Sequence, residues 1–141
     1  MPIANSSAEL ERMIVQEMQK AMQVTQRKIE ADMFEEVGKF YTQGNPRLYT
    51  RTGNLGNSPR TTTISASGTS ASFEAYLDPG SYHVPNEVFT SRGWKSYFSP
   101  LQVLTAAESH AAGILGKGGF WSRSLKRMKT EIITTIGQFF N

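Results

Sequence analysis

Four basic side chains cluster near the C-terminus, at a spacing that could neutralise phosphate groups. Lys and Arg bind nucleic acid mainly through its phosphates, and the neighbouring Phe120 and Trp121 could stack on exposed bases. We favour a solvated helix face over direct DNA binding, because no known recognition motif accompanies the charge. Docking on an acidic protein surface is a third interpretation. The candidate basic patch consists of Arg123, Lys126, Arg127 and Lys129.

Residues that commonly carry catalysis or bind metals are scarce. The chain has no cysteine, and its two histidines, His83 and His110, lie far apart with no carboxylate at ligand spacing. This argues against a zinc or iron site. The glycine-rich stretch 113–119 does not match a phosphate-binding loop, because Ala111 and Gly118 stand where that motif needs Gly and Ser or Thr. We therefore expect no enzymatic activity and no cofactor or metal.

The elements around these residues fit one domain, 1–141. The composition, 38% hydrophobic and 19% charged, is typical of globular proteins, and a chain of this length can bury most of its apolar surface. No apolar run approaches the roughly 20 residues that span a bilayer, and the N-terminus lacks a signal-peptide pattern. We expect a soluble protein with no membrane partner.

The net charge of +3 is unevenly distributed along the chain. Residues 1–44 carry five basic and seven acidic side chains, a balance of 5 − 7 = −2. Residues 115–141 carry five basic side chains and one acidic side chain, a balance of 5 − 1 = +4. The chain therefore begins mildly acidic and ends basic.

A long helix is predicted over residues 7–43. Ser6 and Glu9 have the spacing of a capping box, and apolar residues then recur at helical spacing from Leu10 to Tyr41. Such a helix would measure about 50 Å, longer than the core of this domain needs, so we expect part of it to contact another chain. Its middle, 19–27, is poor in strongly apolar residues and is the part expected to leave the core. Met18 and Met22 are candidate interface residues there, although core filling is the favoured interpretation of the methionines.

A hinge is predicted over 44–60 and a β-hairpin over 61–78. The hinge motif, Arg51, Thr52, Gly53, Asn54 and Leu55, combines residues that tolerate positive φ with an arginine. Gly53 and Asn54 are expected to shape a tight turn, and Arg51 to pair with a carboxylate or carbonyl. The hairpin strands, 61–67 and 71–77, flank a three-residue loop. Alternation in the second strand predicts that Ala71, Phe73, Ala75 and Leu77 face the core.

An aromatic loop is predicted over 79–99, where periodicity fails. Aromatic residues are enriched both in cores and at interfaces, so the loop is expected to be ordered and to dock on the chain itself or on a neighbour. Its candidate interface residues are Phe89, Trp94, Tyr97 and Phe98.

The remaining residues, 100–141, predict two helices. Ser99 and Pro100 begin a short helix that ends near Ala112, and 116–119 reads as a flexible connector. Ser122 or Ser124 would cap the last helix. The basic patch in its first two turns opposes the helix dipole unless a carboxylate or phosphate faces it. The apolar residues of this helix recur on one stripe: Leu125, Met128, Ile132, Ile136 and Phe140.

Together these elements predict an α+β fold. A long N-terminal helix packs on a small antiparallel sheet, and a short helix and a basic C-terminal helix complete the chain.

The order of residues in 49–58, Tyr-Thr-Arg-Thr-Gly-Asn-Leu-Gly-Asn-Ser, lies between a long helix and a Thr-rich strand. In this position it resembles the minor structural proteins that join head and tail in long-tailed bacteriophages, the neck or tail-completion family. The most specific part is Arg-Thr-Gly-Asn-Leu at 51–55. A weaker similarity lies in 119–125, Gly-Phe-Trp-Ser-Arg-Ser-Leu. The chain departs from the family at Gly56, where members often have a basic residue.

The resemblance implies a non-enzymatic virion protein that assembles in the host cytoplasm and forms a ring, most plausibly sixfold, at the top of the tail. Its implied partners are further copies of itself, tail-tube or tail-terminator proteins and head-side connector proteins, with DNA passing through the lumen. An acidic start that meets a basic end is one way for neighbours to fix their register. One alternative is a tail terminator that caps the tube, and another is a nucleic-acid-binding protein that uses the C-terminal helix.

Overall fold

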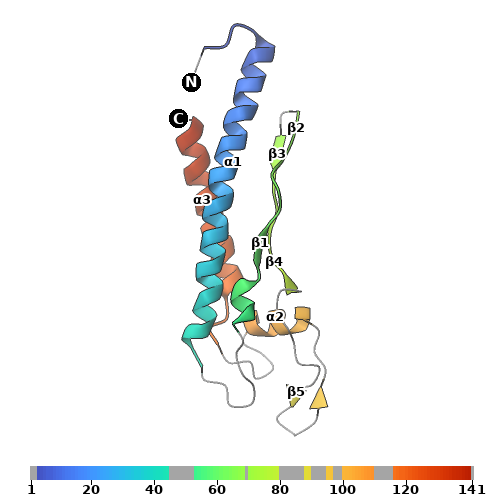
Figure 1. Ribbon diagram of the computed structural model, residues 1–141. Coiled ribbons are helices and arrows are strands. Elements are labelled where there is room, and N and C mark those ends of the chain that lie inside the picture. The colour runs from blue at the N-terminus through green and yellow to red at the C-terminus, as the bar shows by residue number, and fades with distance from the viewer. Residues whose placement is uncertain are drawn as a thin grey trace.

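The computed structural model describes residues 3–44, 53–68, 70–79, 88–89, 95–96, 100–109 and 116–140. The fold is α+β, as predicted. Two long helices, α1 (Ser7–Gly38) and α3 (Phe120–Phe140), run antiparallel side by side, and a β-hairpin lies along another side of α1 (Figure 1). A shorter helix, α2 (Pro100–Ser109), lies near the start of α3 (Figure 1).

Helix α1 begins at the predicted cap. The Ser6 hydroxyl accepts a hydrogen bond from the Glu9 amide at 3.1 Å, and the Glu9 carboxylate accepts one from the Asn5 amide at 2.8 Å. The carboxylate thus reaches Asn5 and not the cap residue itself. A 3-10 turn, η1 (Lys39–Thr42), continues the helix almost to the predicted end.

The middle of α1 does not leave the core, contrary to the expectation for residues 19–27. Ala21 and Thr25 are fully buried, because small side chains let a neighbouring helix approach closely, and the Thr25 hydroxyl is satisfied by the Ala21 carbonyl at 2.8 Å. Three large apolar residues of α1 are exposed: Leu10 and Ile14 near its start, at 43% and 36%, and Phe34 in its later half, at 39%.

The hairpin is one antiparallel pair interrupted by a bulge. In its inner part Pro59 pairs with Leu77, and in its outer part Ser65 pairs with Ser72. The Thr62 amide donates to the Glu74 carbonyl at 2.9 Å. Residues 63 and 64 of the first strand therefore lie opposite the single residue 73 of the second strand, and the register shifts by one residue. The strands are β1 (Pro59–Thr61), β2 (Ser65–Ser67), β3 (Ser70–Ser72) and β4 (Ala75–Leu77).

Two details of the predicted hairpin were wrong. Its first strand begins at Pro59, inside the segment assigned to the hinge, and its loop has two residues, 68 and 69, because Ser67 pairs with Ser70. The predicted faces of the second strand are confirmed, since burial alternates strictly from Ala71 to Leu77.

The hairpin is tied to α1 by side-chain hydrogen bonds. The Gln26 amide donates to the Thr62 carbonyl at 2.6 Å, and the Thr61 hydroxyl donates to the Glu30 carboxylate at 2.7 Å. The packing of the long helix on the sheet is therefore confirmed.

Most of the predicted aromatic loop lies outside the described residues. Within 79–99 the structure has a short antiparallel pair, β5 (Val88–Phe89) with β6 (Lys95–Ser96). No strand was predicted there, because two-residue strands are too short to produce a periodic pattern.

The core lies where the end of α1, helix α2 and the start of α3 meet. Its buried residues are Val37, Phe40, Ala107 and Phe120. The rings of Phe40 and Phe120 meet edge to face, with centroids 6.1 Å apart, a favourable aromatic geometry.

The connector before α3 is packed and not the flexible linker expected. The Lys117 amide donates to the Phe40 carbonyl at 3.0 Å, and the Gly119 amide donates to the Glu108 carbonyl at 2.8 Å. A Cβ on Gly118 would stand 2.5 Å from that same Glu108 carbonyl oxygen. Only glycine lets the connector pass this close to α2.

The predicted apolar stripe of α3 does not face α1. Leu125, Ile132 and Phe140 are exposed, and the side of α3 that faces α1 carries the buried Ser124 and Thr135. Periodicity located a real apolar stripe, but the contact between the two long helices is largely polar.

Candidate functional site

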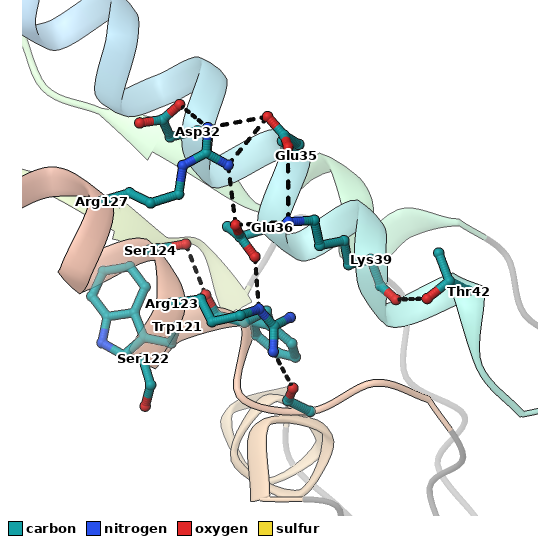
Figure 2. A network of polar contacts seen from close by, with 12 residues as sticks. Asp32, Glu35, Glu36, Lys39, Thr42, Trp121, Ser122, Arg123, Ser124 and Arg127 are labelled. Carbon is teal, nitrogen blue, oxygen red and sulfur yellow. Dashed lines mark hydrogen bonds and ion pairs between the residues drawn. The ribbon is translucent and has the colours of Figure 1, made fainter. Parts of the chain in front are cut away.

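Charged side chains join α1 to α3 along their contact (Figure 2). Asp32 and Glu36 stand four residues apart on α1, and Arg123 and Arg127 stand four residues apart on α3, so each pair shares one helix face. Figure 2 shows the two arginines pointing across to the carboxylates. We call this network the ion-paired seam; its members are Asp32, Glu35, Glu36, Lys39, Arg123 and Arg127.

Glu36 is the centre of the ion-paired seam. Its side chain is 4% exposed and accepts from Arg123 Nε at 2.7 Å, from Arg127 Nη1 at 3.0 Å and from Lys39 Nζ at 3.0 Å. Burial raises the pKa of this carboxyl, but the hydrogen bonds from Arg123, Lys39 and Arg127 outweigh burial and lower the pKa to about 2. Glu36 is therefore ionised at neutral pH.

Asp32 lies one turn earlier and shares Arg127 with the exposed Glu35. Arg127 Nη2 donates to Asp32 Oδ1 at 2.6 Å and to Glu35 Oε2 at 3.1 Å. Burial raises the pKa of Asp32, and the nearby Glu131 carboxylate raises it further, against the opposing effect of Arg127. The two buried carboxylates of the seam are thus shifted in opposite directions.

The contact continues along α3 toward its C-terminal end. Lys28 Nζ lies 3.2 Å from the Thr135 hydroxyl and 3.9 Å from the Glu131 carboxylate. Glu131, the only acidic residue of α3, is therefore turned toward α1.

A carboxylate from α2 caps the start of α3. Glu108 accepts from the Trp121 amide at 2.9 Å and from the Ser122 amide at 3.1 Å. Neither Ser122 nor Ser124 is the cap, because the helix begins at Phe120. The carboxylate accepts hydrogen bonds from amides that have no partner within the helix, and its negative charge interacts favourably with the positive end of the helix dipole. It occupies the place at this helix start that a phosphate would take.

The structure divides the candidate basic patch into two pairs. Arg123 and Arg127 belong to the ion-paired seam. Lys126 and Lys129 are exposed, and neither has an ion pair among the described residues. The groups predicted to face these cations were carboxylates or phosphates. Carboxylates face the two arginines, and they are Asp32, Glu35 and Glu36.

The free lysines share the side of α3 turned away from α1 with apolar residues. Leu125 and Ile132 are 48% and 47% exposed, and Ile133 is 65% exposed. Lys129 lies between Leu125 and Ile132 at helical spacing. We call this surface the outward face of α3; it consists of Leu125, Lys126, Lys129, Ile132, Ile133 and Phe140.

The candidate interface residues are not gathered into one surface by the described structure. Met18 and Met22 are half-buried on α1, and Phe89 belongs to β5. Trp94, Tyr97 and Phe98 lie outside the described residues.

The hinge motif is partly described. Gly53 has φ +80°, a left-handed conformation that favours glycine, and it precedes the 3-10 turn η2 (Asn54–Asn57). Leu55 packs against the core, and the Gly56 amide donates to the Tyr41 hydroxyl at 3.1 Å. The turn is thus attached to the end of α1. Arg51 and Thr52, and with them the predicted pairing of Arg51, lie outside the described residues.

The surface offers an open groove of about 400 Å³ between α1 and β1. It is lined by Gln26, Arg27, Glu30, Ala31, Phe34 and Thr61. Within the part of the chain that the structure describes, no group of three or more acidic or imidazole side chains could hold a metal ion. None of the described helices is long and apolar enough to cross a membrane.

Comparison with known protein families, with curated proteins and with solved structures found no match.

Sequence reasoning missed Glu108, Asp32 and Glu36 as partners of α3. The spacing of four between Asp32 and Glu36, matched by the same spacing between Arg123 and Arg127, is a signal that could have paired the helices. Glu108 gave no comparable signal, because its contact depends on how closely the connector passes α2.

Proposed function

We propose that this chain is a structural virion protein of a long-tailed bacteriophage. In this proposal copies of the chain form a ring, most plausibly of six, at the neck and join the tail to the DNA-filled head. The protein has no enzymatic role. Its partners are further copies of itself, tail-tube or tail-terminator proteins, and head-side connector proteins, and DNA passes through the lumen. It assembles in the host cytoplasm and stays in the virion.

The observation that carries this proposal is the resemblance of residues 49–58 to the neck and tail-completion family. The described part of that stretch, from Gly53, forms a turn fixed to Tyr41 and to the core. The motif thus serves the fold of the subunit, in keeping with a structural protein.

The outward face of α3 supports assembly with other proteins. A soluble monomer rarely leaves a long apolar stripe in solvent, and here Leu125, Ile132, Ile133 and Phe140 are all exposed on one helix. The exposure is explained if neighbouring subunits cover this face in the assembly.

Binding of nucleic acid through the basic patch is the weaker alternative. Two of its four cations, Arg123 and Arg127, are engaged by carboxylates, and Glu108 occupies the helix start. Of the four cations in the patch, Lys126 and Lys129 remain available to bind phosphate groups. A chain that showed salt-sensitive DNA binding abolished by Lys126→Gln with Lys129→Gln would favour this class.

The test is an infection in which expression of the chain is suppressed, examined by electron microscopy. We expect DNA-filled heads and separate tails of normal length, with joining restored when the purified protein is added to the lysate. Normal joined particles would contradict the proposal. Tails of abnormal length would assign the chain to the tail-terminator role instead.

A further inference from the structure

The helix contact leaves the start of α1 without a partner from α3. Two contacts fix the antiparallel register: Asp32 with Arg127 and Lys28 with Glu131. The residue numbers sum to 159 in both, so Phe140, at the end of α3, stands opposite residue 159 − 140 = 19. Figure 1 shows the first turns of α1 extending past the end of α3. We call residues 7–18 the overhang.

The overhang continues the face of α1 that α3 covers further along. Leu10, Ile14, Ala21 and Thr25 recur at helical spacing on one side of the helix. Ala21 and Thr25 are fully buried, whereas Leu10 and Ile14 are exposed. The exposed pair is therefore the unfilled continuation of a helix–helix contact, and a second helix fits it.

The charge of the overhang is negative. It carries Glu9, Glu11 and Glu17 against Arg12, a balance of 1 − 3 = −2, and Lys20, two residues beyond the overhang, pairs with Glu17 at 3.1 Å. Glu17 follows Leu10 by seven residues and lies on the same side as the exposed apolar pair. Arg12 lies on a different side.

The outward face of α3 has the opposite charge and is long enough to cover the overhang. Its cations, Lys126 and Lys129, contribute +2, and the one acidic residue of α3, Glu131, is turned toward Lys28. From Leu125 to Phe140 the outward face spans 16 residues, about 24 Å, whereas the overhang spans 12 residues, about 18 Å.

We infer that the outward face of α3 in one copy covers the overhang of α1 in the next copy. Leu10 and Ile14 pack against Leu125, Ile132 and Ile133, and Lys126 and Lys129 face Glu11 and Glu17. Because two different surfaces meet, the contact is head-to-tail and can close into a ring. Packing of two outward faces on each other would place lysines against lysines, which is unfavourable. This inference rests on the proposed function for the ring but concerns the subunit contact alone.

Charge reversal on the two surfaces tests the contact. Variant A carries Lys126→Glu and Lys129→Glu, and variant B carries Glu11→Lys and Glu17→Lys. Each variant has two surfaces of like charge, so its self-association, measured by sedimentation velocity at low salt, should weaken by about tenfold or more. A mixture of A and B, and a chain with all four changes, should associate as the unmodified chain does.

The controls separate this contact from others. Arg27→Glu reverses an exposed charge on α1 outside both surfaces and should leave association unchanged. Ile132→Gln with Ile133→Gln should weaken it without altering the helical circular dichroism. An unmodified chain that stays monomeric at every concentration up to about 1 mM would overturn the inference. So would unchanged association of A and B, or association of the four-change chain as weak as that of A.

The outcome for the contact is distinct from the outcome for the proposed function. If A and B lose self-association and recover it together, but the protein does not restore head–tail joining, the contact holds and the neck role fails. If A and B still restore joining and still self-associate, the neck role holds and the contact fails.

Discussion

At the scale of single residues, Glu36 decides how firmly α1 holds α3. Three cations converge on this buried carboxylate, and two of them come from α3. Burying a charge is costly unless it is paired, so each partner depends on the other. A lone carboxylate or a lone arginine at this place would be strongly unfavourable.

We expect Glu36→Gln to lower the free energy of unfolding by about 3 kcal/mol, the lower end of the cost of breaking a buried ion pair. The lower end applies because the arginines are partly exposed and can be hydrated. Urea unfolding followed by circular dichroism measures the change. Lys20→Gln is the matched control: it breaks an exposed pair with Glu17 and lies outside both contact surfaces, so the loss should stay below about 1 kcal/mol. Equal losses would mean that the seam is no stronger than a surface pair.

The pH dependence of stability follows from the same group. Glu36 has a pKa of about 2 in the folded chain and an ordinary value of 4.5. Its stabilisation is therefore complete above pH 4.5 and is lost as the pH falls from 4.5 to 2. Asp32, whose pKa is raised, acts in the opposite sense, because its contribution falls as the pH rises above 3.8.

Unfolding free energies of the unmodified chain and of Glu36→Gln, measured between pH 2 and pH 7, test this assignment. We expect the difference between the two proteins to be largest at neutral pH and to shrink steadily below pH 4.5. A difference that is constant over this range would show that ionised Glu36 does not stabilise the fold.

At the scale of elements, the connector sets where α3 begins. Gly118 passes the Glu108 carbonyl at a distance that no side chain allows, and Glu108 then caps the helix through the Trp121 and Ser122 amides. The position of α3 against α1 therefore depends on a glycine and a carboxylate outside both helices.

Replacement of two glycines by alanine should give opposite results. Gly118→Ala places a Cβ against backbone and should lower the unfolding free energy by about 1–3 kcal/mol, as overpacking does. Gly137→Ala, inside α3 with nothing within 4 Å of the new Cβ, should raise it by up to about 1 kcal/mol. Thermal unfolding of both variants supplies the measurement. A neutral Gly118→Ala would show that the connector has room to move.

Some features of the helices and strands could be predicted from sequence patterns alone. The Ser6 cap, the proline start of α2 at Pro100 and the alternation from Ala71 to Leu77 depend on neighbours in the sequence, and these features were predicted. The bulge at residues 63 and 64 was not, because it shifts the register without changing the period-two pattern on either side.

At the scale of the whole molecule, the apolar stripe of α3 does not determine which side of the helix is buried. The sequence predicts an apolar stripe on α3, but the residues that lie along the contact with α1 are Arg123, Ser124, Arg127 and Thr135. Small and paired charged groups let two helices meet without an apolar stripe. Periodicity shows that a helix has an apolar side and a polar side. Which side is buried depends on the element that packs against the helix.

The candidate site was predicted in the same partial way. The sequence predicted a basic patch of four cations on one helix, with the condition that a carboxylate or a phosphate faces it. Which two of its cations would be paired could not be predicted, because that depends on the register of α1 against α3. The division into seam arginines and free lysines, Lys126 and Lys129, is what directs attention to the outward face of α3.

The mass of the assembled 141-residue chain in solution tests the central claim most directly. Native mass spectrometry of the purified protein should give one closed assembly, most plausibly of six copies, that is lost when Lys126 and Lys129 are both changed to Glu. A monomer at all concentrations, or an open-ended series of sizes with no closed species, would contradict the account of this chain as a ring-forming neck protein.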